Sequence, residues 1–152
     1  MRVHLHGEQA QDAFGRKIAS RLQSPCVIYL DGDLGTGKTT LVRGVLRGLG
    51  HTRSVRSPTY TLLEPYDLGG MRLYHLDLYR LGDPEELEFV GLRDLLDEES
   101  VLLVEWPERG AGILPPPDLV IRITYAPSGR DLHLLQRSQR GVRLVAALSE
   151  KT

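Results

Sequence analysis

The feature that most constrains this chain is a glycine-rich loop between a short apolar run and an amphipathic one. Residues 26–30 are wholly apolar and rich in β-forming side chains, which predicts a strand buried on both faces. From residue 38 to residue 49 apolar side chains recur with helical spacing, which predicts a helix that Gly50 ends. The loop between them reads Gly32-x4-Gly37-Lys38-Thr39.

This loop matches the phosphate-binding pattern G-x-x-x-x-G-K-[ST]. Its glycines let backbone N–H groups approach phosphate oxygens, and the following helix adds its N-terminal dipole. Lys38 then reaches the outer phosphates of a nucleotide, and the Thr39 hydroxyl ligates Mg²⁺. A chance match in a chain of this length has a probability of roughly 0.5% at average residue frequencies. The predicted nucleotide-binding residues are Asp33, Leu34, Gly35, Thr36, Gly37, Lys38, Thr39 and Thr40.

A site of this kind needs an acid beside the metal, and two acids stand at the ends of predicted strands. Glu105 directly follows the apolar residues 101–104, as in a Walker B strand with Glu in place of Asp. Asp77 lies within a predicted strand over residues 71–79. Ligands of open α/β sheets collect at the carboxyl ends of the strands. Either acid can contact Mg²⁺ directly while the other acts through a water; the alternative for each is a structural carboxylate paired with an arginine.

Other residues have a functional and an ordinary interpretation. The segment Ser57-Pro58-Thr59-Tyr60-Thr61 lies where phosphate-loop enzymes often sense the γ-phosphate, but a proline-set turn explains it nearly as well. His75 is expected as a packed histidine more than a catalytic one. Trp106 is expected in the core or at an interface, and Arg130 in a surface turn.

The remaining elements follow from periodicity and turn residues. Gly44 and Gly48, four residues apart in the predicted helix, allow a neighbouring element to pack closely. We expect helices over residues 8–23, 83–90 and 92–98, strands over 60–63, 71–79 and 101–104, a turn at 67–70, a loop over 107–117, a hairpin of strands 119–125 and 132–136 joined by residues 127–130, and a last strand or helix over 142–148.

Composition narrows the class of protein. With 152 residues, 41% of them hydrophobic and 26% charged, we expect one globular domain spanning residues 1–152. No apolar run approaches the about 18–20 residues of a membrane span, and the first ten residues lack the apolar core of a secretion signal. A single cysteine, Cys26, excludes an intrachain disulfide. We therefore expect a cytoplasmic protein with no membrane contact and no disulfide partner.

Charge is unevenly distributed along the chain. Residues 34–63 contain no acid but five basic side chains, whereas residues 77–99 contain nine acids against Arg80 and Arg93. The simpler interpretation is two solvated faces. The alternative is a basic end that faces phosphate and an acidic face that docks a partner.

Five sequence blocks in order resemble the bacterial TsaE family, the ATPase subunit of the machinery that makes threonylcarbamoyladenosine in tRNA. They read GDLGTGKTT from residue 32, SPTYTL from 57, HLDLYRL from 75, EEL from 85 followed by Gly91, and VEWP from 104. The resemblance extends over essentially the whole chain and is densest from residue 31 to residue 117. In the last third, Tyr125-x3-Gly129-Arg130 carries it.

The resemblance implies an α/β fold: a single P-loop NTPase-like domain with a mixed central sheet, flanking helices and a C-terminal β-hairpin. It implies that the chain binds ATP or ADP with Mg²⁺, which Thr39 and Glu105 would hold. Lys38, Asp77 and Glu105 would serve catalysis. Arg130, and the segment near Glu8, would lie near the adenine.

The resemblance also implies partners. These would be TsaD and TsaB, which transfer the threonylcarbamoyl group to the adenosine beside the anticodon of tRNAs that read ANN codons. ATP hydrolysis would support that cycle, and contact with tRNA would come through the complex.

Three other functions compete with this one. A small-molecule or nucleoside kinase shares the loop, but kinases usually carry an Arg-rich lid, and here a proline-rich segment and a hairpin take that place. A GTPase is disfavoured because the chain contains no asparagine and so lacks the guanine-specifying Asn-Lys-x-Asp motif. A module that binds a nucleotide and barely hydrolyses it remains open.

Overall fold

The structure is a computed structural model that describes residues 1–55 and 62–150. The expected γ-phosphate-sensing segment, residues 57–61, lies outside the described residues. The elements in chain order are β1 (Arg2–Leu5), α1 (Gly7–Arg21), β2 (Cys26–Asp31), α2 (Lys38–Gly48), β3 (Leu63–Asp67), β4 (Arg72–Asp77), α3 (Glu86–Phe89), α4 (Leu92–Leu95), β5 (Ser100–Glu105), the 3₁₀ turn η1 (Pro107–Gly110), β6 (Leu119–Ala126), β7 (Gly129–Gln136) and α5 (Gln139–Ser149).

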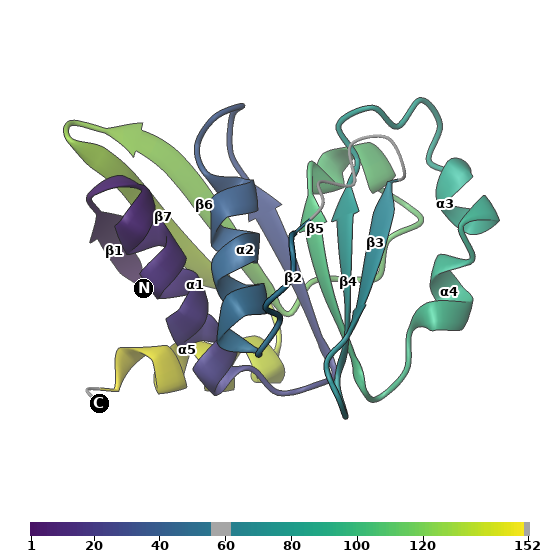
Figure 1. Ribbon diagram of the computed structural model, residues 1–152. Coiled ribbons are helices and arrows are strands. Elements are labelled where there is room, and N and C mark those ends of the chain that lie inside the picture. The colour runs from purple at the N-terminus through teal and green to yellow at the C-terminus, as the bar shows by residue number, and fades with distance from the viewer. Residues whose placement is uncertain (56–61, 151–152) are drawn as a thin grey trace.

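The described strands form one seven-stranded sheet in the order β1-β7-β6-β2-β5-β4-β3. The four central strands, β6, β2, β5 and β4, are parallel, and the strands toward both edges are antiparallel. Figure 1 shows α1 and α2 side by side against the sheet, with the loop that joins β2 to α2 at the top. The predicted fold class, a mixed α/β sheet with a C-terminal hairpin formed by β6 and β7, is confirmed.

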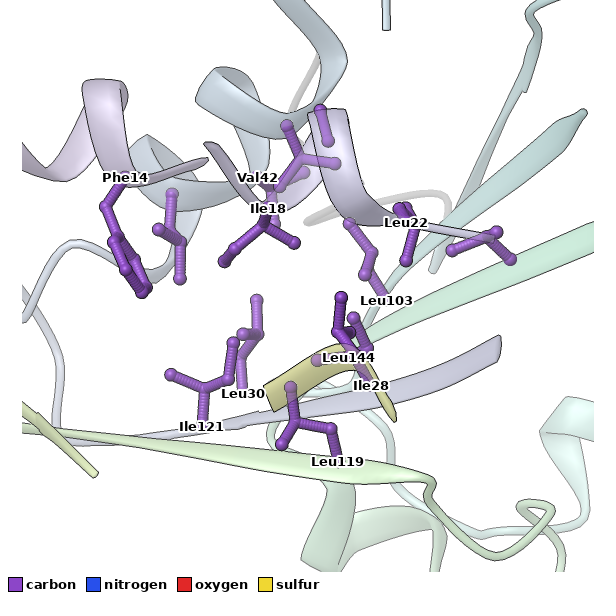
Figure 2. Packing of buried hydrophobic residues seen from close by; sticks show 14 of the residues in the cluster. Phe14, Ile18, Leu22, Ile28, Leu30, Val42, Leu103, Leu119, Ile121 and Leu144 are labelled. Atoms are coloured by element: carbon purple, nitrogen blue, oxygen red, sulfur yellow. The ribbon is translucent and has the colours of Figure 1, made fainter. Parts of the chain in front are cut away.

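Two hydrophobic clusters lie on opposite faces of the sheet. In the larger one, side chains of α1, α2 and α5 point toward those of β2, β5 and β6 (Figure 2). In the smaller one, Leu87 of α3 and Leu92 of α4 pack with Tyr74, Leu76 and Val104 of the sheet. Strand β5 is buried along its whole length, whereas β2 alternates between buried and half-buried side chains. The sheet is therefore covered on both faces in its β4–β5 part, which holds the strand ends of the site.

Helices α1 and α2 cross closely because glycines line their contact. A Cβ atom added to Gly44 would lie 2.3 Å from the Asp12 carbonyl oxygen, and one added to Gly48 would lie 2.6 Å from Ala19 Cβ. Gly15 on α1 faces α2 with the same lack of room. The contact fixes α2, and therefore the loop at its N-terminus, against the rest of the domain.

We predict that Gly44→Ala lowers the free energy of unfolding by about 1–3 kcal/mol, because the added methyl group must push the helices apart. The matched control is Gly82→Ala, where the nearest atom to a new Cβ is 3.7 Å away. Urea unfolding of both variants followed by circular dichroism measures the difference. Equal stability of Gly44→Ala and wild type would show that the helices have room to separate.

Strand β1 was not predicted, and β3 lies later in the chain than expected. In β1, Arg2 and His4 alternate with inward-facing residues while the strand pairs with β7. Strand β3 covers Leu63–Asp67 instead of residues 60–63, of which 60 and 61 are not described. β3 contains Pro65, which an edge strand can accommodate because a missing N–H there need not cost a bond of the sheet.

Other element boundaries also differ from the predictions, and α3 (Glu86–Phe89) and α4 (Leu92–Leu95) are shorter than the expected helices over residues 83–90 and 92–98. Strand β4 ends at Asp77, because the Asp77 carboxylate accepts a hydrogen bond from the Tyr79 N–H (3.0 Å) and turns the chain out of the sheet. Arg130 is not in the hairpin turn as predicted: Ala126 pairs with Gly129, and Arg130 lies on β7, where it pairs with Tyr125 of β6. The last element, left open between strand and helix, is helix α5, whose N-terminus the Ser138 hydroxyl caps.

Cys26 is a free, buried cysteine in the larger cluster, as expected for a small core residue. Burial, with a smaller contribution from Asp118, raises the pKa of its thiol to about 12. Among residues 1–55 and 62–150, no helix combines the length and the apolar character needed to span a bilayer.

Candidate functional site

The site lies where the parallel strands β2, β4 and β5 end. Asp77 is the last residue of β4 and Glu105 the last of β5, and the two are direct partners in the register of the strands. On the other side, Glu105 is paired with Leu30 of β2, just before the glycine-rich loop. The fold therefore brings both predicted acids to the loop, at the edge where open α/β sheets hold their ligands.

The glycine-rich loop is shaped by its own hydrogen bonds and by one residue of α1. Gly37 has φ +99°, and a Cβ at this position would overlap the Gln11 side chain. Gln11 is buried, and its amide donates to the Thr36 carbonyl (2.8 Å). The Thr36 hydroxyl donates to the Asp33 carbonyl (2.9 Å). Gln11 was not predicted as a site residue. Its position on the same helix face as the buried Phe14, three residues away, indicated a buried polar side chain that needs a partner.

Lys38 lies at the start of α2 with its ammonium at the centre of the site. Its Nζ donates to the Gly32 carbonyl (2.5 Å) and lies 3.6 Å from the centroid of a Trp106 ring. Burial lowers the pKa of Lys38, whereas the carboxylates of Glu105 and Asp77 act in the opposite direction. The ammonium is thus partly desolvated, which strengthens its attraction to an anion in the site.

Glu105 is held on two sides. The Thr39 hydroxyl lies 3.3 and 3.2 Å from its two carboxylate oxygens, and His75 Nε2 lies 2.6 Å from Oε2. Glu105 is only 3% exposed, and His75 is wholly buried. His75 is therefore a hydrogen-bonded, buried histidine, as the ordinary interpretation expected, and its partner is a candidate metal ligand.

Asp77 lies beside Glu105 and lines the same cavity. Burial raises the pKa of its carboxyl group, and the neighbouring Glu105 adds to that effect. The hydrogen bond from the Tyr79 N–H and the nearby His75 and Lys38 act in the opposite direction. The charged form of Asp77 is consequently disfavoured in this position relative to water.

These side chains surround a cavity of about 470 Å³, which we call the P-loop cavity. Its wall is completed by two aromatic residues that follow the strand ends. Tyr79 and Trp106 have ring centroids 5.0 Å apart, and Trp106 has a left-handed backbone (φ 57°, ψ 51°) that turns the chain at the end of β5. Trp106, expected in the core or at an interface, is in the wall of this cavity, and Tyr79 was not predicted as a site residue. The lining is Leu34, Gly35, Gly37, Lys38, Thr39, Thr40, Asp77, Tyr79, Arg80, Glu105 and Trp106.

A second cavity of about 370 Å³, the side cavity, adjoins the first through Gly35, Gly37 and Thr40. Glu8 and Arg130, far apart in the sequence, both line it. Arg130 Nη2 donates to the Gly35 carbonyl (3.4 Å), and its guanidinium lies 4.6 Å from the Tyr125 ring centroid. Its buried Nε has no hydrogen-bond partner among the residues that the structure describes.

Two predicted binding residues keep their side chains out of both cavities. Asp33 is exposed and lines neither cavity, so only its carbonyl contributes, within the loop. The Thr36 side chain is likewise turned into the loop. Leu34 is 60% exposed at the mouth of the P-loop cavity, and its carbonyl accepts a hydrogen bond from the Tyr125 hydroxyl.

The donor set at the end of β5 has the chemistry of a Mg²⁺ site. Thr39 and Glu105 offer hard oxygen atoms 3.2–3.3 Å apart, which suit this ion. In the described ranges no group of three or more His, Cys, Asp or Glu side chains is arranged to hold a metal. A nucleotide-bound Mg²⁺ does not require one, because phosphate oxygens and waters supply most of its ligands. The residues present therefore fit the ion.

Comparison with known proteins places the chain in a family. The family described as "Threonylcarbamoyl adenosine biosynthesis protein TsaE" matches residues 5–132. The tRNA threonylcarbamoyladenosine biosynthesis protein TsaE of Haemophilus influenzae is 48% identical over 141 residues, covering 90% of this chain and 89% of that protein. The TsaE protein of Synechocystis is 43% identical, over 72% of this chain and 71% of that protein. The crystal structure of Bacillus subtilis YdiB superimposes with a TM-score of 0.83 at 30% identity, covering 98% of this chain and 93% of that one.

Proposed function

The chain belongs to the TsaE family of threonylcarbamoyladenosine biosynthesis proteins, and from this premise we propose that it is a Mg²⁺-dependent ATP-binding protein and ATPase that serves this modification of tRNA. One observation carries the proposal. Lys38 and Thr39 at the start of α2 and Glu105 at the end of β5 line a single cavity at the strand ends. An ammonium, a hydroxyl and a carboxylate in this arrangement match the needs of a triphosphate with its metal.

Each residue has a distinct role in this proposal. The backbone N–H groups of the loop and the Lys38 ammonium bind the β- and γ-phosphates and offset their charge. Thr39 and Glu105 hold Mg²⁺, which when bound neutralises charge that develops on the phosphates. Asp77 orients the water that attacks the γ-phosphate, because it lines the cavity beside Glu105 while its carboxylate accepts a hydrogen bond from the Tyr79 N–H.

The side cavity provides a place for the rest of the nucleotide. It opens next to Gly35 and Gly37, so a ligand whose phosphates lie on the loop can extend into it. The guanidinium of Arg130 stacks on Tyr125, its buried Nε lacks a hydrogen-bond partner within the described part of the chain, and Glu8 lines the same cavity. We assign this cavity to the adenine and ribose.

The metal assignment predicts that Thr39→Ala and Glu105→Ala weaken ADP binding in the presence of Mg²⁺ more than in the presence of EDTA. Each substitution removes one hard oxygen ligand and leaves the loop that binds the phosphates. Isothermal titration calorimetry under both conditions measures the two dissociation constants. Equal weakening with and without Mg²⁺ would show that neither side chain acts through the metal.

We further propose that TsaD and TsaB are partners of this chain and raise its rate of hydrolysis. P-loop proteins of this kind often need a partner to complete the γ-phosphate environment. Residues 83–99 carry eight exposed acids, of which Arg72 and Arg93 pair with only three, and we call this segment the acidic surface. Phe89 projects from it and is 90% exposed. An exposed aromatic within a charged rim is typical of a docking site.

Phe89→Ala is therefore expected to lower partner-stimulated ATP hydrolysis about tenfold or more, as loss of an interface hot spot would. Hydrolysis by the isolated chain should not change, because Phe89 lines neither cavity. The control is Val142→Ala, an exposed apolar residue on α5. Steady-state phosphate release, with and without TsaD and TsaB, gives both rates. Full stimulation of the Phe89 variant would exclude the acidic surface as the docking site.

The same assay tests the proposed function as a whole. Slow hydrolysis by the chain alone that rises with both partners supports it. Phosphorylation of a small acceptor by the isolated chain would instead favour the kinase. Nucleotide binding without hydrolysis, even with the partners present, would leave a binding module.

A further inference from the structure

The buried imidazole of His75 contacts the Glu105 carboxylate but lines neither the P-loop cavity nor the side cavity. His75 lies on β4 two residues before Asp77 and is opposite Leu103 in the register with β5. From there its ring reaches diagonally to Glu105, with Nε2 2.6 Å from Oε2. His75 is 0% exposed and does not line the P-loop cavity, so it cannot contact the nucleotide itself.

The two ring nitrogens are in different surroundings. Nε2 has the Glu105 carboxylate as its partner, whereas Nδ1 is buried and has no hydrogen-bond partner among the described residues. A protonated Nδ1 would be a buried donor without an acceptor, which is costly, while a bare Nδ1 lone pair costs less. The carboxylate accepts hydrogen bonds and does not donate. These surroundings favour the tautomer that carries its proton on Nε2 and donates it to Glu105.

Glu105 needs such support more than a shorter acid would. Compared with Asp, a Glu side chain has one more rotatable bond, and ordering it costs more conformational entropy. The Thr39 hydroxyl is a second partner of the carboxylate, at 3.2 and 3.3 Å, and it belongs to the cavity wall where the ligand would bind. His75, by contrast, is fixed in the sheet and out of reach of the ligand.

We propose that His75 is a positioning residue that holds the Glu105 carboxylate in the orientation required to ligate Mg²⁺. The inference rests on the proposed role of Glu105 as a metal ligand. Residues that orient a metal ligand in this way typically contribute about 10- to 100-fold to metal affinity. His75 thus acts on the metal through Glu105 and contacts neither the metal nor the nucleotide.

The test compares two amides that differ in reach. In His75→Gln the side-chain amide nitrogen can take the place of Nε2 and donate to Glu105. In His75→Asn the same group is one methylene shorter and stops near the position of Nδ1. Calorimetric titration with ADP, once with Mg²⁺ and once with EDTA, gives the ratio of dissociation constants for wild type and both variants. Thermal unfolding establishes that each variant is folded.

We expect His75→Asn to raise the dissociation constant for ADP about 10- to 100-fold with Mg²⁺ and to leave the value in EDTA nearly unchanged. His75→Gln should restore most of the wild-type ratio. A purely structural role would shift both conditions together and would not distinguish the two amides. A folded His75→Asn variant that keeps the wild-type ratio overturns the inference and leaves the proposed function intact. A wild-type protein that binds ADP equally well with and without Mg²⁺ overturns the metal assignment, and the inference with it.

A second measurement requires only the wild-type chain without nucleotide. Nitrogen-15 NMR of the imidazole should show a single tautomer for His75, with the proton on Nε2 and a bare Nδ1. A bare Nε2, with the single ring proton on Nδ1, would mean that the ring cannot donate to Glu105 from Nε2 and would overturn the inference.

Discussion

Replacement of Lys38 by alanine should abolish detectable ATP binding while the protein remains folded. The Lys38 ammonium is the one positive side chain in direct contact with both the loop carbonyl of Gly32 and the ring of Trp106 in the described P-loop cavity. Burial lowers the pKa of this ammonium, because the charged group loses part of its hydration in the nucleotide-free protein. The attraction between the ammonium and the bound phosphates offsets this loss of hydration. The alanine variant loses the attraction without losing a core contact.

Calorimetric titration with ATP measures the effect, and circular dichroism with thermal unfolding verifies the fold. Lys38→Met retains most of the aliphatic stem and should bind ATP as poorly as Lys38→Ala, which separates the charge from packing. Lys17→Ala, a lysine on α1 that lines neither cavity, should bind ATP like wild type. An unchanged affinity in either Lys38 variant would refute the assignment of the loop to phosphate binding.

The parts of the site that are continuous in the sequence were predictable. Strand β2, the glycine-rich loop and helix α2 follow one another directly, and their local signals, an apolar run, glycines and helical periodicity, agree. Glu105 was also predictable, because a single acid directly after a buried apolar strand marks the carboxyl end of that strand. The confirmed fold class follows from the same signals together with the family resemblance.

Contacts between distant segments were not predictable in the same way. Gln11 bonds to Thr36 across 25 residues and His75 to Glu105 across 30. In neither case does the local sequence around one residue indicate which distant residue it contacts. The polarity of Gln11 on a buried helix face and of His75 within a buried strand showed only that each needed a partner.

The boundary errors have a related cause. Strand β1 owes its place to pairing with β7, and Arg130 became a strand residue because the turn of the hairpin takes only Pro127 and Ser128. Pro65 is acceptable because β3 is at the edge of the sheet. Each of these features depends on which strands are neighbours in the sheet, and the hydrophobic pattern of the sequence does not predict that order.

Without a ligand, the strand ends hold charged groups in surroundings that disfavour their charge. Burial disfavours the charged forms of Lys38 and of Asp77, so each is less favourable here than in water. Asp77 and Glu105 are moreover neighbouring acids in register. Residues that serve a reaction often keep a conformation or charge that costs stability. Asp77 provides a direct test of this relation.

Asp77→Asn should slow ATP hydrolysis about 100-fold or more while ATP affinity changes far less, because a residue that acts on the attacking water contributes mainly in the transition state. The same substitution should make the nucleotide-free protein more stable at neutral pH. Asparagine retains the oxygen that accepts the Tyr79 N–H hydrogen bond and removes the buried charge. Single-turnover kinetics, calorimetric titration with ATP and thermal unfolding measure the three quantities.

The pH dependence of stability tests whether the charge of Asp77 destabilises the nucleotide-free protein. Burial raises the pKa of Asp77 above its ordinary value of about 3.9, so the unfolded chain gives up this proton at lower pH than the folded one. The stability advantage of Asp77→Asn should therefore be complete above the raised pKa and disappear as the pH falls below about 4. Asp94→Asn, at an exposed acid on α4, should alter neither hydrolysis by the isolated chain nor this pH profile. Equal losses of ATP affinity and turnover in Asp77→Asn would instead make Asp77 a direct ligand of the metal.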